Sequence, residues 1–147
     1  MLIVADENIP FAREAFSTLG EVRLASGRAL TPAMVRDAEL LLVRSITRVD
    51  RALLEGSRVR FAATATIGTD HVDEAWLKQA GIAFAAAPGS NANSVGEYVV
   101  CALLTLAARQ GRPLAGRSIG IVGVGNVGTR VEAKCRALGM EVRLNDP

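Results

Sequence analysis

The sequence predicts an α/β protein in which parallel strands are covered by helices. Two observations carry this prediction. Short apolar runs rich in branched side chains recur along the chain, and segments with the spacing of amphipathic helices separate them. Hydrophobic residues make up 50% of the 147 residues and charged residues 22%, which is the balance of a folded globular protein.

Five strands are expected before residue 90, because five short apolar runs there are bounded by polar or turn-forming residues. The expected strands are 2–5, 21–24, 40–43, 61–64 and 82–85. The helices expected between them are 10–19, a helix starting at Thr31-Pro32, 51–55 and 73–80. Thr31 and Asp50 are the expected N-caps, since their side chains can satisfy free N–H groups in a first helical turn.

A turn-rich segment, Ala87-Pro88-Gly89-Ser90-Asn91, interrupts this pattern and predicts a domain boundary. We therefore expect one domain over residues 1–93 and the start of a second over 94–147. The elements expected in the second are a long apolar helix over 94–108, a strand over 118–122, a helix over 126–138 and a strand over 141–144.

Composition argues against several functional classes. The net charge of +2 is spread along the chain, which gives no reason to expect a nucleic-acid partner. The longest apolar stretch is too short to span a bilayer, and the N-terminus lacks the features of a signal peptide, so we expect a cytoplasmic protein with no membrane contact. Cys101 and Cys135 lie in apolar helical patterns, and we expect reduced core thiols and no metal site.

The residues Gly123-Val124-Gly125-Asn126-Val127-Gly128 match the GxGxxG pattern of dinucleotide-binding proteins. The pattern follows an expected strand and opens an expected helix. Gly123 would permit the tight turn, Gly125 the close approach of a pyrophosphate, and Gly128 close packing of the helix on the strand. The alternative is a glycine-rich turn with a purely structural role.

Asp146 lies 18 residues after the last glycine of this pattern, at the end of the next expected strand. A carboxylate there accepts hydrogen bonds from ribose hydroxyls and repels a 2′-phosphate, which favours NAD over NADP. The predicted cofactor-binding residues are Gly123, Gly125, Asn126, Val127, Gly128 and Asp146.

Two further motifs precede the glycine pattern: GTDHVD at 68–73, and PGSN at 88–91 followed by SVGE at 94–97. Together they resemble the D-2-hydroxyacid dehydrogenases. More narrowly, DENIPFAR at 6–13, VRSITRVD at 43–50, GTDHVDEAWLKQAGI at 68–82 and GIVGVGNVG at 120–128 resemble the branch of that family that oxidises 4-phospho-D-erythronate in vitamin B6 biosynthesis.

The resemblance implies a flavodoxin-like, parallel-sheet substrate domain followed by the first part of a Rossmann NAD-binding domain. It also implies a cytoplasmic homodimer that oxidises the C2 hydroxyl of 4-phospho-D-erythronate to 2-oxo-3-hydroxy-4-phosphobutanoate. Two alternatives stay open: another family member, such as one acting on phosphoglycerate, or a non-catalytic nucleotide-binding module.

Four residues of the first domain are predicted to bind substrate. The resemblance places Ser45 and Thr66 on the substrate, and both follow expected strands, where parallel sheets gather ligands. Local turn bonding is the alternative for such hydroxyls. Arg44 is a candidate for a phosphate or carboxylate because a guanidinium binds either anion in a fork, and the turn at Gly68 can present backbone N–H groups to an anion.

No catalytic residue is expected in this chain. In the family the resemblance indicates, the Arg, Glu and His that carry the reaction come later, so we expect the 147 residues alone to be inactive. His71 is the only histidine, yet its place between Asp70 and Asp73 at a helix start indicates a structural role. Glu97, in the first turn of the expected long helix, is interpreted as a helix N-terminal carboxylate.

Overall fold

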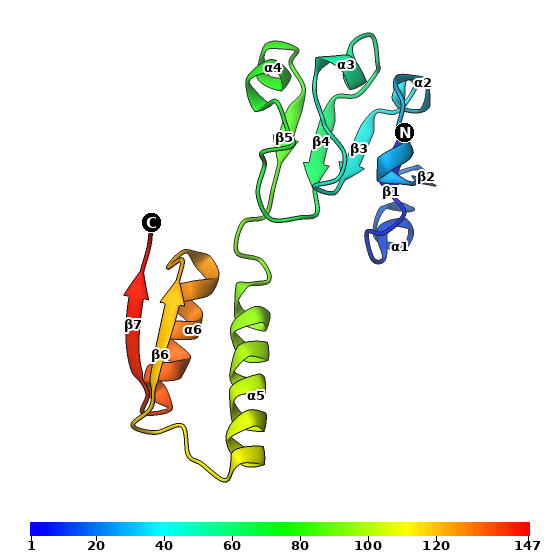
Figure 1. Ribbon diagram of the computed structural model, residues 1–147. Helices are drawn as coiled ribbons and strands as arrows, with labels where there is room; N and C mark the ends of the chain where they lie inside the picture. The colour runs from blue at the N-terminus through cyan, green and yellow to red at the C-terminus, as the bar shows by residue number, and fades with distance from the viewer. The chain divides into compact units, whose positions relative to one another are not determined.

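The computed structural model describes all 147 residues, which form two compact units, Met1–Ala87 and Pro88–Pro147 (Figure 1). The division lies six residues before the expected boundary at 93/94. The reason is local: the backbone of Gly89 lies against the side chain of Asn126, and Gly89 accepts a hydrogen bond from the N–H of Ala92. The turn after Ala87 therefore belongs with the second unit.

The first unit is built on a five-stranded sheet in which every neighbouring pair is parallel. The strands are β1 (Leu2–Asp6), β2 (Glu21–Ala25), β3 (Leu40–Val43), β4 (Phe61–Thr64) and β5 (Ala83–Ala85). Their spatial order is β2-β1-β3-β4-β5, the order of a flavodoxin-like sheet. The predicted α/β class and parallel sheet are confirmed.

Short helices connect these strands. They are α1 (Ala12–Phe16), the 3₁₀ turn η1 (Gly27–Ala29), α2 (Pro32–Val35), α3 (Arg51–Leu54) and α4 (Glu74–Gln79). The buried side chains of α2, α3 and α4 pack on one face of the sheet, and those of α1 pack on the other.

Alternation along the central strand, β3, decides which side chains face each side of the sheet. Leu41 and Val43 point to the face covered by three helices, whereas Leu40 and Leu42 point to the face of α1. Because all four residues of β3 are buried, both faces of this strand are covered, as a continuous apolar run predicts.

The second unit contains two helices and a two-stranded parallel sheet. Its elements are α5 (Ala92–Gln110), β6 (Ser118–Val122), α6 (Asn126–Ala137) and β7 (Glu141–Asn145). The buried residues Val131, Cys135 and Met140 form its small core, and side chains of α5, β6 and β7 pack around them. Gly96 lies against Lys134 and Arg130, which brings α5 and α6 close together.

Three expectations about elements need correction. The first helix spans only Ala12–Phe16, because Phe11 before it adopts a left-handed conformation (φ 58°) and a turn replaces the helix after Ser17. Helix α5 is longer than expected, so Glu97 lies in its second turn and accepts a hydrogen bond from Asn93. Cys135 is buried as predicted, but Cys101 is exposed, because the packed face of α5 is the one that carries Val99 and Leu103.

Candidate functional site

The carboxyl ends of β1, β3 and β4 form the first candidate site. The chain passes from β1 to β2 on one side of β1 and then crosses to β3 on its other side, so the direction of winding reverses between β1 and β3. In open parallel sheets ligands bind outside the carboxyl ends of strands at such a reversal. The predicted substrate residues lie in the segments that follow β3 and β4.

Arg44 and Ser45 directly follow β3. The side chain of Arg44 is half-buried and forms none of the ion pairs of the chain, so its guanidinium is available to an external anion. Ser45 is exposed. The carbonyl of Arg44 accepts a hydrogen bond from the N–H of Thr47 (3.1 Å), which closes a tight turn around both residues.

Thr66 and Gly68 lie in the neighbouring segment after β4. The N–H of Ala65 donates to the carbonyl of Val43 (2.9 Å), so the segments that carry Ser45 and Thr66 leave the sheet side by side. Gly68 has a left-handed conformation (φ 83°), and a side chain there would meet only the Asp70 carboxylate, at 4.0 Å. The turn is therefore open to a ligand.

One set of hydrogen-bonded contacts in this region could not be predicted from the sequence. The Oγ1 atom of Thr64, the last residue of β4, lies 3.0 Å from Nε2 of His71 and 3.1 Å from Oγ1 of Thr66. Burial lowers the pKa of His71, and the nearby Asp70 carboxylate partly offsets this effect. His71 is thus tied to a predicted substrate residue through Thr64, seven positions away.

The second unpredicted feature is a buried carboxylate at the end of β1. Asp6 is fully buried; its Oδ1 accepts a hydrogen bond from the N–H of Asn8 (2.8 Å), and its Oδ2 has no partner. Gly27 packs against it so closely that a side chain there would meet both Asp6 Oδ2 and Thr47 Oγ1, and Thr47 donates to the carbonyl of Gly27 (2.9 Å). The only sequence signal for this buried carboxylate was the position of Asp6 directly after the apolar run 2–5.

The glycine pattern in the second unit has the geometry expected of a dinucleotide turn. Gly123 follows β6 with a φ of 90°, which favours glycine. A side chain on Gly128 would overlap the carbonyl of Gly123, whereas one on Gly125 would meet no atom of the chain within 4 Å. Gly128 is thus needed for packing, and the space beside Gly125 is open.

This open space adjoins the N-terminus of α6. Gly125 is the N-cap and no side chain caps the helix, so its first N–H groups are free to bind an anion. The Val127 side chain packs into the core of the unit, which leaves its backbone N–H as its possible ligand contact, and the Asn126 side chain lies against Gly89.

Asp146 follows β7 and reaches this same turn. Its Oδ1 accepts a hydrogen bond from the N–H of Val124 (3.1 Å), and the side chain is exposed. The structure thus brings the six residues predicted to bind cofactor to one loop region of the second unit. These residues fit a dinucleotide: free helix N–H groups for the diphosphate, open space beside Gly125, and an exposed carboxylate for a ribose.

Other surface features do not coincide with these sites. An open hollow of about 380 Å³ beside α5 is lined mainly by aliphatic residues such as Leu103, Leu106 and Met140, and lies away from the glycine turn. No three His, Cys, Asp or Glu side chains gather where they could hold a metal ion. No helix is both long enough and apolar enough to cross a membrane.

A parallel flavodoxin-like sheet, followed by a strand–glycine turn–helix unit, is an architecture found in nucleotide-dependent dehydrogenases. Residues 2–141 match the model for the catalytic domain of D-isomer specific 2-hydroxyacid dehydrogenases, and the chain belongs to this family.

The relatives of the chain point to one branch of the family. Over all 147 residues it is 58% identical to "Erythronate-4-phosphate dehydrogenase" of Citrobacter koseri, and it spans 39% of the length of that relative. NAD+-bound 3-phosphoglycerate dehydrogenase of Entamoeba histolytica is 28% identical, with a TM-score of 0.73 over 100% of this chain and 54% of that one.

The fold itself is shared more widely. The TT0316 protein of Thermus thermophilus has a TM-score of 0.79 at 22% identity, over 99% of this chain and 56% of that one.

Proposed function

We propose that this chain supplies the substrate-binding part and the first nucleotide-binding elements of an enzyme that oxidises 4-phospho-D-erythronate with NAD. The observation that carries the proposal is the 58% identity over the whole chain to a relative with that named activity. In the reaction the C2 hydroxyl loses its proton, the C2 hydrogen leaves as hydride, and 2-oxo-3-hydroxy-4-phosphobutanoate forms. NAD, when bound, accepts the hydride.

The substrate is assigned to the carboxyl ends of β3 and β4. A phosphorylated hydroxy acid carries two anionic groups, and this edge offers the Arg44 guanidinium, the hydroxyls of Ser45 and Thr66, and the backbone N–H groups of the Gly68 turn. A guanidinium and backbone N–H groups are both established anion ligands, so the donors match the ligand in kind.

The nucleotide is assigned to the second unit. The free N–H groups at the start of α6 would hold the diphosphate, and the open space beside Gly125 would admit it. One oxygen of Asp146 accepts the N–H of Val124, which leaves the other for ribose hydroxyls. A 2′-phosphate at this position would face a carboxylate, which supports NAD over NADP.

From the family resemblance we place the catalytic Arg, Glu and His outside these 147 residues; the only histidine present is hydrogen-bonded to Thr64. A general base must reach the hydroxyl proton that it removes, and no second candidate histidine is present in this chain. A homodimer in the cytoplasm is part of the same proposal.

A hybrid enzyme tests the proposal. In it, this chain replaces the 147 residues that it matches in the Citrobacter koseri relative. We expect the hybrid to reduce NAD with 4-phospho-D-erythronate and to prefer that substrate to 3-phospho-D-glycerate, while the 147 residues alone show no turnover. Preference for 3-phospho-D-glycerate would instead favour a phosphoglycerate dehydrogenase, and NAD binding without turnover on either acid would favour a nucleotide-binding module.

A further inference from the structure

The hydrogen-bonded row His71–Thr64–Thr66 links the only histidine of the chain to a hydroxyl of the proposed substrate site. The two spacings, 3.0 Å and 3.1 Å, are both within hydrogen-bond range. Thr64, in the middle of the row, is buried, and His71 and Thr66 at its two ends are half-buried. The segment of His71 is itself fixed, because its carbonyl accepts the N–H of Val49 (2.8 Å).

Counting protons shows that the row has only two consistent directions. Each hydroxyl has one proton and two lone pairs, and neutral imidazole has one donor and one acceptor nitrogen. One lone pair of Thr64 Oγ1 accepts the backbone N–H of Thr66 (3.4 Å), so this oxygen can accept only one further hydrogen bond. If His71 Nε2–H donates to Thr64, then Thr64 donates to Thr66, and the Thr66 proton points away from the row. If Nε2 accepts instead, every proton points inward, and Thr66 presents only lone pairs to a ligand.

We propose that His71 is a positioning residue that directs the hydroxyl proton of Thr66 toward an anionic group of the substrate. An anion needs a donor, so its binding selects the direction in which Nε2 carries the proton. This inference rests on the proposed function, because it assumes that Thr66 contacts the substrate. The ligand chemistry is an oxyanion, which in the proposed substrate is either the carboxylate or the phosphate.

The charged groups near His71 are few. Asp70 and Asp73 lie on its own segment, and Arg48 and Asp50 flank Val49, which bridges to Val72. Arg48 and Asp50 pair with each other at 3.0 Å. An imidazolium has no acceptor nitrogen, so protonation of His71 also enforces the outward direction. The row therefore couples the protonation and tautomer of His71 to the anion at Thr66.

Imidazole NMR of the 147-residue chain tests this coupling directly, since a single histidine gives unambiguous signals. The probes are 4-phospho-D-erythronate, D-erythronate and inorganic phosphate, added separately. We expect the oxyanion that contacts Thr66 to shift the neutral tautomer toward Nε2–H and to raise the His71 pKa. If Thr66 contacts the phosphate, only 4-phospho-D-erythronate and inorganic phosphate should shift the His71 tautomer. If Thr66 contacts the carboxylate, D-erythronate should shift it as well.

The Thr64→Val variant is the matched control, because it keeps the shape of the side chain and removes the hydroxyl of the row. A nearby negative charge alone would raise the His71 pKa in this variant too, but it would not change the tautomer. We expect the tautomer response to disappear in Thr64→Val. An unchanged tautomer response in Thr64→Val would show that the Thr64 hydroxyl does not couple His71 to Thr66.

Backbone amide signals distinguish a failure of the His71 inference from a failure of the proposed substrate site. If the probes shift amides of residues 44–47 and 65–68 but leave the tautomer of His71 unchanged, the inference is wrong and the proposed substrate site stands. If the probes shift none of these amides, the substrate site is wrong, and the inference falls with it.

Kinetics of the hybrid enzyme provide a second, independent test. His71→Phe should lower kcat/KM for 4-phospho-D-erythronate about tenfold, mainly through KM, as expected for one weakened hydrogen bond to a charged group. His71→Gln, whose amide can donate like Nε2–H, should stay within about threefold of the parent. Equal losses in both variants, or a loss confined to kcat, would contradict a positioning role.

Discussion

At the scale of single residues, the candidate substrate site depends on buried polar groups at the ends of central strands. Thr64 ends β4 and Asp6 ends β1; both are buried, yet each connects to a segment that leaves the sheet. Buried polar groups are costly unless they form hydrogen bonds, so these residues constrain the backbone around the site.

Gly27 is the first residue-scale test, because a side chain there would overlap the Asp6 carboxylate and crowd Thr47. Gly27→Ala should lower the free energy of unfolding of the first unit by about 1–3 kcal/mol, the usual cost of overpacking. Trp76 is the only tryptophan and packs on the core of that unit, so its fluorescence in denaturant reports this loss.

The control for this prediction is the adjacent Ser26→Ala, which adds no atoms and removes a hydroxyl that caps no helix. It should leave the unfolding midpoint nearly unchanged. Equal stability of the two variants would show that the contact between Gly27 and Asp6 is not tightly packed.

His71 predicts a pH dependence of stability. Its pKa in the folded chain lies below its ordinary value because of burial, so the unfolded state binds more protons in the interval between the two values. Stability therefore rises with pH through that interval and is lost as the pH falls from about 6.5 through the folded pKa. Urea unfolding at several pH values, followed by Trp76, measures this loss.

His71→Gln does not titrate and serves as the reference for this experiment. The parent should lose more stability than His71→Gln between pH 7 and pH 5. Parallel stability profiles for the two proteins would mean that His71 is no harder to protonate in the folded chain than in the unfolded one.

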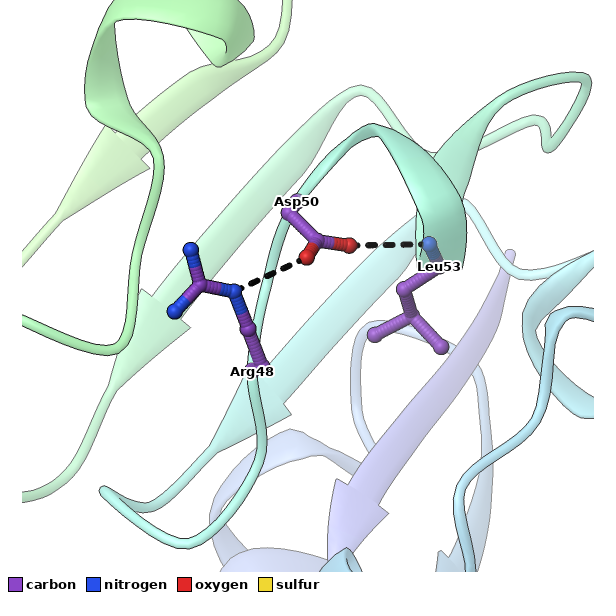
Figure 2. A network of polar contacts seen from close by, with 3 residues as sticks. All are labelled: Arg48, Asp50 and Leu53. Atoms are coloured by element: carbon purple, nitrogen blue, oxygen red, sulfur yellow. Dashed lines mark hydrogen bonds and ion pairs between the residues drawn. The ribbon is translucent and has the colours of Figure 1, made fainter.

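At the scale of elements, helix caps distinguish what the sequence predicts from what tertiary contacts decide. Asp50 caps α3 as predicted: it accepts the N–H of Leu53 at 3.1 Å and also pairs with Arg48 (Figure 2). Thr31 precedes α2 at the predicted position, but its side chain forms no capping hydrogen bond.

Asp50→Ala should therefore lower the free energy of unfolding by about 0.5–2 kcal/mol, the usual contribution of an N-cap, whereas Thr31→Ala should change it little. Asp50→Ser retains a capping oxygen and loses only the exposed ion pair with Arg48, so it should keep most of the stability. Trp76 fluorescence in urea measures all three variants. A loss in Asp50→Ser as large as in Asp50→Ala would assign the effect to the ion pair.

The glycine turn gives a second element-scale prediction, because one of its glycines is needed for packing and another borders open space. Gly128→Ala should destabilise the second unit, since the new methyl group would overlap the carbonyl of Gly123. Gly125→Ala should leave the unit stable, because no atom lies within 4 Å and its φ of −76° suits alanine. In the hybrid enzyme, Gly125→Ala should still weaken NAD binding at least tenfold.

Circular dichroism and NADH fluorescence measure the two effects separately, and Gly120→Ala, also in open space, is the control. Unaltered NAD affinity in a folded Gly125→Ala hybrid would remove the glycine turn from the nucleotide site.

Sequence patterns were most reliable where local chemistry decides the structure. The bounds of β3, β4 and β6 were predicted to the residue, because short apolar runs bounded by polar or turn-forming residues mark strands clearly. The length of α1 was not, since the left-handed Phe11 is a local exception to residue preferences. The His71–Thr64 contact escaped prediction because it depends on how a loop folds back onto a strand end.

At the scale of the whole molecule, the proposed function assigns the substrate to one unit and the nucleotide to the other. Donors for a phosphorylated acid lie at the edge of the first sheet, and groups that suit a dinucleotide lie around one turn of the second unit. The chain spans 39% of the length of its curated relatives, so this division of duties is best tested in the hybrid enzyme.

The decisive measurement compares Ser45→Ala, Thr66→Ala and Asp146→Ala in the hybrid enzyme, with KM for 4-phospho-D-erythronate and Kd for NAD determined for each. The account predicts that the first two raise the substrate KM and leave NAD affinity near the parent value. Asp146→Ala should weaken NAD binding by about 1.5–3 kcal/mol, the range for hydrogen bonds to a charged group. If Ser45→Ala and Thr66→Ala weaken NAD binding and leave the substrate KM unchanged, the assignment of substrate and nucleotide to the two units is contradicted.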